Sequence, residues 1–121
     1  MNRDQERARH AYQAAAQAKS ELKDKFEDYK GAVKDLGADI LRNGLAAAVS
    51  TLERDKSRQE VRLVFRDLAS AGIPHFEECT GESLPSRIRE LETAHYMLAT
   101  RETLKFVVWL KRAVEAKGDQ K

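Results

Sequence analysis

The residues that could do metal chemistry gather in one segment, which contains His75, Glu77, Glu78 and Cys79. Imidazole, carboxylate and thiolate groups are the usual protein ligands of zinc. The spacing matches no standard closed zinc set, and no second pair of ligands lies close in sequence. We therefore expect a structural role for this segment, with no metal and no other cofactor.

Other catalytic signatures are missing as well. His10 and His95 fall on predicted helices, and His95 lies on an apolar face, where a core histidine is far commoner than a ligand. The sequence contains no nucleophile elbow and no glycine-rich phosphate loop. We expect a protein that is not an enzyme. A metal-dependent enzyme built on His75 and Cys79 is the least favoured alternative, and it predicts stoichiometric bound metal.

The basic side chains form two rows at helical spacing. The first comprises Arg58, Arg62 and Arg66 at successive turns, extended upstream by Arg54, and the second comprises Arg3, Arg7 and His10. Rows of guanidinium groups suit a phosphate backbone, because arginine donates planar, forked hydrogen bonds. The alternative is a solvated face whose arginines pair with Glu60, Asp67 or Asp4.

The most apolar stretch of the chain is its last predicted helix, which carries the single tryptophan. Thr100 is a candidate cap at its start, and its apolar stripe comprises Leu104, Val107, Val108, Leu110 and Val114. Trp109 is flanked by Lys105 and Arg112, so it is either a stacking platform for a base or a core residue crossed by the stems of these cations. The core interpretation is favoured. It leaves Arg101, Lys105 and Arg112 as a cationic rim.

Length and composition limit the class of protein. The 121 residues suit one domain, residues 1–121, and the single cysteine allows no intrachain disulfide. The start of the chain is too charged for a signal peptide, and no apolar run approaches membrane length. We expect a cytoplasmic protein with no membrane partner. Its net charge of +2 means that any nucleic-acid binding must come from local patches.

The apolar spacing is helical almost throughout, which predicts an all-α fold, a compact single-domain bundle of about five or six helices. The first helix is capped by Asn2 with Gln5, has Ala8, Tyr12, Ala15 and Leu22 on its buried seam, and is interrupted at Gly31 and Gly37. A second helix is predicted over about residues 38–54, with Gly44 inside it and Leu41 and Leu45 on its buried face.

The third helix is predicted to open with a capping box formed by Ser57 and Glu60, to bury Val61, Val64, Phe65 and Leu68, and to close at Gly72. A loop at about 74–84 follows, and then a fourth helix opens at Ser83, Leu84 and Pro85. That helix continues into the last one or kinks at Ala99 and Thr100. Residues 117–121 are expected to be a disordered tail.

Two blocks carry a resemblance to a known family. They are residues 40–45, with Asn43, Gly44 and Leu45, and residues 99–112, with Thr100, Glu102 and Trp109. Both resemble the small helical subunit of type III-B CRISPR (Cmr) effector complexes. The resemblance also covers Gln5, Arg7 and Ala8 near the start, and Tyr29 ahead of the first block.

The resemblance implies a non-catalytic subunit that stacks in the inner filament of an RNA-guided complex acting in prokaryotic antiviral defence. Its partners would be copies of itself, the large polymerase-like subunit, the backbone subunits, and the guide and target RNA. Its RNA contacts would be independent of sequence, because base pairing reads the target. The candidates for these contacts are Arg54, Arg58, Arg62, Arg66, Arg3, Arg7, Arg101, Lys105 and Arg112. The alternative is a freestanding protein–protein adaptor that uses its apolar last helix and binds no nucleic acid.

Overall fold

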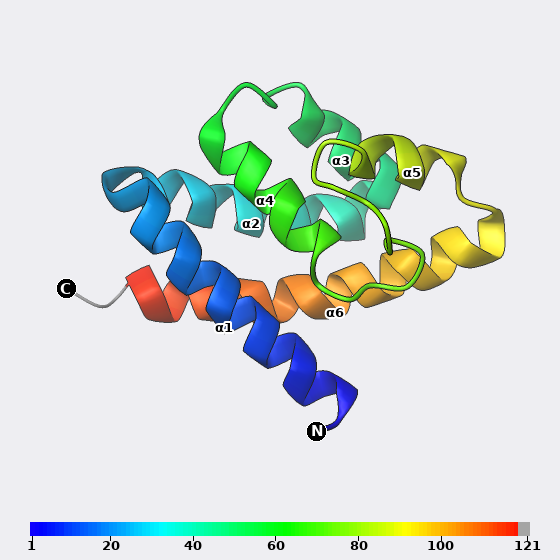
Figure 1. The fold of residues 1–121 in the computed structure, drawn as a ribbon. Helices are drawn as coiled ribbons and strands as arrows, with labels where there is room; N and C mark the ends of the chain where they lie inside the picture. The colour runs from blue at the N-terminus through cyan, green and yellow to red at the C-terminus, as the bar shows by residue number, and fades with distance from the viewer. Residues whose placement is uncertain (119–121) are drawn as a thin grey trace.

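The computed structural model describes residues 1–118, which fold into six α-helices (Figure 1). The elements are α1 (Arg3–Leu22), a 3-10 turn η1 (Lys23–Lys25), α2 (Phe26–Asn43), α3 (Leu45–Glu53), α4 (Gln59–Ala69), α5 (Leu84–Glu90) and α6 (Thr93–Gly118). No strand occurs in this part of the chain. The predicted all-α fold is confirmed.

The long helix α6 is the scaffold on which α1 and α2 pack (Figure 1). Its 26 residues span about 39 Å. Its buried face comprises Ala99, Phe106, Val107, Leu110, Ala113 and Val114. The prediction for Val108 was wrong, because its side chain is 49% exposed on the opposite face. The predicted tail at 117–121 lies mainly outside the described residues, and its described part, 117–118, continues α6.

Helix α1 crosses α6 through small side chains (Figure 1). Its capping box is present, because Gln5 N–H donates to Asn2 Oδ1 over 2.8 Å and Asn2 N–H donates to Gln5 Oε1 over 2.9 Å. Its buried face is made by Ala11, Ala14, Ala15, Ala18 and Leu22. Tyr12, predicted for the seam, is 41% exposed. Small residues let the two helices approach closely, which the bulky Tyr12 would prevent.

The interruption of the first predicted helix lies at η1 and not at Gly31 or Gly37. Lys23 has a positive φ of 54° and turns the chain there. Both glycines lie inside α2. A Cβ atom at Gly37 would meet Val107 Cγ1 at 3.2 Å, so this glycine allows α2 and α6 to pack closely.

Gly44 divides the second predicted helix into α2 and α3. Its φ of 91° is in the region that favours glycine, so a continuous helix through this position was a wrong prediction. Tyr96 from α6 fills the corner, where its hydroxyl accepts a hydrogen bond from Ala46 N–H over 2.9 Å. Because of this break, Leu41 and Leu45 do not lie on one buried helix face as predicted. Leu45 is fully buried, whereas Leu41 is 76% exposed.

Helix α4 buries the four residues predicted for it. Its predicted capping box is absent, because Arg58 is the residue that precedes the helix and no side chain caps it. The connection from α4 to α5 covers the predicted loop, and α5 begins after Ser83 as expected.

The break before α6 was placed wrongly. It falls at Leu91, whose backbone is extended, so that α6 begins at Thr93 and runs through Ala99. Thr100 caps nothing. It lies inside α6, where its hydroxyl donates to the carbonyl of Tyr96 over 2.8 Å.

Candidate functional site

The arginines near the start of α1 are held by one buried carboxylate. Glu102, only 5% exposed, accepts hydrogen bonds from Arg7 and from Arg3, the latter over 3.1 Å. Arg7 also lies 3.7 Å from Asp4. Burial by itself would raise the pKa of Glu102, but the hydrogen bond and charge of Arg7, with the charges of Lys105 and Arg3, outweigh it and lower that pKa. This row of arginines therefore joins α1 to α6, and His10 lies beside it.

Trp109 continues the same contact between the two helices. Its indole N–H donates to Asp4 Oδ1 over 2.9 Å, and the guanidinium carbon of Arg112 lies 5.0 Å from the ring centroid. The ring is half-buried against the hydrophobic core. This is the arrangement that the core interpretation expects. One face of the ring is covered by Arg112 and so does not offer a platform to a base.

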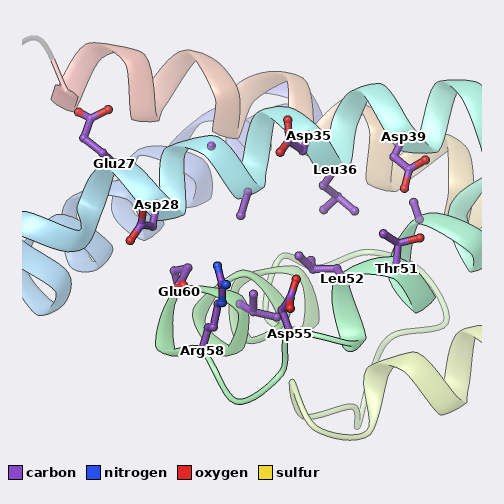
Figure 2. Close-up of a pocket in the computed structure, with 14 residues that line it drawn as sticks. Glu27, Asp28, Asp35, Leu36, Asp39, Thr51, Leu52, Asp55, Arg58 and Glu60 are labelled. Carbon is purple, nitrogen blue, oxygen red and sulfur yellow. The ribbon is translucent and has the colours of Figure 1, made fainter.

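The row of arginines on α4 is divided among different partners. Arg66 pairs with Glu21 over 3.0 Å and with Asp67 over 3.1 Å. Arg62 donates to the carbonyl of Ser57 over 2.6 Å and remains exposed. Figure 2 shows that Arg58 points toward α2, into a groove lined with carboxylates. The straight row expected from the spacing is not formed, because the helix begins only at Gln59.

A buried network lies behind Arg66. The Tyr29 hydroxyl donates to Asp67 Oδ2 over 2.5 Å. Burial raises the pKa of Asp67, and the hydrogen bond from Tyr29 and the charge of Arg66 offset this only in part. Burial and the neighbouring Asp67 also raise the pKa of Tyr29. The hydroxyl therefore stays protonated and donates its hydrogen bond to Asp67. Asp67 is thus a buried core residue, and Arg66, whose side chain is 35% exposed, is paired with it.

The turn between α3 and α4 presents a group of exposed cations. Residues 54–59 are all exposed, and they include Arg54 and Lys56. With Arg62 these two residues form what we call the basic turn. Neither Arg54 nor Lys56 makes an ion pair with a side chain in the described part of the chain. Lys56 was missed from the sequence, because a search at helical spacing passes over residues in a turn.

Two further groups of residues singled out in the sequence lie away from the basic turn. Arg101 and Lys105 are exposed on the outer face of α6. The imidazole rings of His75 and His95 stack with their centroids 3.9 Å apart and so attach the loop before α5 to α6.

Within residues 1–118, no three His, Cys, Asp or Glu side chains are grouped so that they could hold a metal ion. In the same residues no helix is both long and apolar enough to cross a membrane.

Comparison with known proteins decides the family. Residues 3–117 match the family model described as CRISPR-associated protein (Cas_Cmr5). The chain belongs to the Cmr5 family. The fold is similar to the crystal structure of a CRISPR-associated Cmr5 family protein from Thermus thermophilus, with a TM-score of 0.79 and 25% identity over 96% of this chain and 97% of that one. No curated protein matches the chain.

Family membership makes the chain a subunit of a multi-subunit Cmr CRISPR complex and bears out the resemblance found in its sequence. It favours a structural, non-enzymatic subunit over a freestanding adaptor. The adaptor also needs the apolar face of the last helix, and that face is covered by α1 and α2.

The residues that carry the family resemblance have roles in the fold itself. Asn43 donates to Asp39 over 2.5 Å at the end of α2, Gly44 makes the break, and Leu45 is fully buried. In the second block, Glu102 and Trp109 bind α1. These Cmr5 signature residues therefore specify how the helices are broken and packed.

Proposed function

We propose that the chain is a non-catalytic subunit that stacks in several copies in the inner filament of a Cmr effector complex and contacts the guide or target RNA through phosphates. Its other neighbours would be the large polymerase-like subunit and the backbone subunits. The complex would act in antiviral defence. The observation that carries the RNA contact is the basic turn, Arg54, Lys56 and Arg62.

The basic turn suits phosphates for three reasons. Arg54 and Lys56 are exposed and form no ion pair with a side chain in the described residues, so no carboxylate there has to be displaced before they bind. The segment that carries Arg54 and Lys56 has six consecutive exposed residues, 54–59, and none of them has an apolar side chain. Arginine and lysine binding to phosphates also releases counterions, which gives affinity without reading a base. This matches a complex in which base pairing supplies the specificity.

The other arginines fit this role less well. Arg3, Arg7 and Arg66 already bind carboxylates, and Arg58 points into an acidic groove. Moving them to RNA would leave those carboxylates unpaired, at a cost of about 3–5 kcal/mol for a buried pair such as Arg7 with Glu102. The RNA contact is therefore proposed for the basic turn rather than for the whole set of candidates.

The test uses the assembled complex with the double variant Arg54→Glu, Lys56→Glu. Target-RNA affinity should fall, and the slope of log affinity against log salt should flatten by about one unit for each phosphate that is no longer bound. Arg9→Glu is the matched control, because Arg9 is an exposed cation on α1. An unchanged salt slope in a fully assembled complex would remove the basic turn from the RNA path. Unchanged assembly length and affinity after deletion of the whole chain would refute the proposed function.

A further inference from the structure

The acidic groove is a feature that the proposed RNA contact does not use. It runs between α2 and the α3–α4 region and encloses about 330 Å³ (Figure 2). Its apolar lining comprises Ala32, Leu36, Ala48, Leu52 and Val61. Its edges carry six carboxylates, Glu27, Asp28, Asp35, Asp39, Asp55 and Glu60, and one guanidinium, Arg58. A groove with this lining suits an apolar surface bordered by cations.

None of the six carboxylates forms an ion pair with a side chain in the described part of the chain. Three of them follow one edge along α2, at Asp28, Asp35 and Asp39, with intervals of seven and then four residues. The helix between the first two carries Gly31 and Ala32. A Cβ atom at Gly31 would meet nothing within 4 Å, so space is open there for a side chain from another molecule.

A surface of the opposite charge lies on α6. Its exposed face, which we call the α6 stripe, comprises Met97, Arg101, Lys105, Val108 and Arg112 at intervals of four, four, three and four residues. Met97 is 65% exposed and Val108 is 49% exposed, and both are among the few large apolar side chains that the described chain leaves in solvent. A helix face with apolar side chains between its cations suits a protein groove better than a phosphate backbone.

The spacing of charges on the two surfaces matches in one orientation. Along α6, the cations Arg101, Lys105 and Arg112 are separated by four and then seven residues. Along α2, the carboxylates Asp28, Asp35 and Asp39 are separated by seven and then four residues. If the helices run antiparallel, Arg112, Lys105 and Arg101 face Asp28, Asp35 and Asp39 in turn. Each set then spans about 16 Å, because both helices rise about 1.5 Å per residue. Val108 falls opposite the open space at Gly31 and Ala32.

We propose that the acidic groove of one copy of this chain receives the α6 stripe of the next copy, with α2 and α6 antiparallel. The inference rests on the proposed stacking and names its two surfaces. In one molecule these surfaces cannot meet, because α6 packs on the far side of α2 from the groove (Figure 2). A contact between two different surfaces is head to tail and continues from copy to copy, which is the geometry of a filament.

The experiment exchanges the central pair of charges. Asp35→Lys and Lys105→Asp each place like charges opposite each other and should weaken the association between copies about tenfold or more. The double variant restores an attractive pair at every interface and should recover the association. Native mass spectrometry of the assembled complex counts the copies, and sedimentation of the isolated chain measures self-association. Glu77→Lys and Arg9→Glu are the matched controls, because both residues are exposed away from the groove.

The outcomes separate this interface from the proposed function. Loss of copies in each single variant and recovery in the double variant support the interface, provided that thermal unfolding shows the variants folded. Unchanged copy number in both single variants overturns the interface and leaves the stacking subunit in place. Unchanged copy number with weaker RNA binding in Lys105→Asp assigns the α6 stripe to RNA and overturns the interface as well. A wild-type complex without several copies of this chain refutes the proposed stacking itself.

Discussion

Replacing Glu102 by glutamine should remove much of the attachment between α1 and α6. The substitution keeps the shape of the side chain but leaves the charge of Arg7 with only the exposed carboxylate of Asp4, at 3.7 Å, and the Arg7 side chain is only 12% exposed. Breaking a buried ion pair from one side costs about 3–5 kcal/mol. The amide oxygen still accepts a hydrogen bond and the Arg3 side chain is 68% exposed, so the low end of the range, about 3 kcal/mol, is expected.

That destabilisation converts into a measurable change in melting temperature. An unfolding entropy of about 2.1 cal/mol/K per residue over 121 residues gives a decrease of about 12 °C. Urea unfolding of the isolated chain, followed by circular dichroism, measures the free energy directly. The control is Glu77→Gln, an exposed carboxylate in the loop before α5, which should change stability by less than about 0.5 kcal/mol.

The dependence on pH gives an independent check. Because the folded protein lowers the pKa of Glu102 from its ordinary value of 4.5, its stabilising effect is complete above that value and is lost as the pH falls through the lower, folded pKa. The glutamine variant has no such proton to bind. The difference between wild type and Glu102→Gln should therefore shrink as the pH falls below 4.5. A cost below about 1 kcal/mol at neutral pH, or a difference that persists in acid, would refute the reasoning.

Four further predictions concern the core and the glycines. Tyr29→Phe should cost about 1–3 kcal/mol in urea unfolding, because buried Asp67 loses a hydrogen-bond donor, and an unchanged midpoint would contradict this. Gly31→Ala should stabilise the chain by about 0.4–1 kcal/mol, since the new methyl group meets nothing and α2 continues through this position. Gly81→Ala should cost about 1–3 kcal/mol, because its Cβ would lie 2.9 Å from the α4 backbone, and equal melting temperatures for these two alanine variants would overturn both. Gly44→Ala should cost about 1–3 kcal/mol, because its φ of 91° and ψ of 165° lie in a region that almost only glycine adopts, and calorimetry showing no destabilisation would refute the strain.

Much of the fold could be predicted from local chemistry. The capping box of Asn2 and Gln5, the apolar face of α4 and the start of α5 at Ser83 depend on residues within a few positions of one another. The family could also be predicted, because the two blocks at 40–45 and 99–112 contain the residues that fix helix packing.

The helix breaks could not be predicted in the same way. Gly31, Gly37 and Gly44 look alike in sequence, yet of these three Gly44 alone has a positive φ. The difference comes from other helices, since Val107 packs against Gly37 and Tyr96 fills the corner at Gly44. Breaks such as those at Lys23 and Leu91 likewise depend on where the rest of the chain requires a turn.

The helical character of the chain, the mostly apolar face of each helix and the family all follow from the order of residues alone, because these properties are written in spacing and local hydrogen bonding. Which charges are available to another molecule follows only from the packing of the helices. In the sequence, Arg7 and Lys105 are equally good candidates for an RNA contact, but Arg7 is half-buried and paired with Glu102 while Lys105 faces solvent. The physical reason is that a cation is free to bind RNA or protein only where no other helix places a carboxylate beside it.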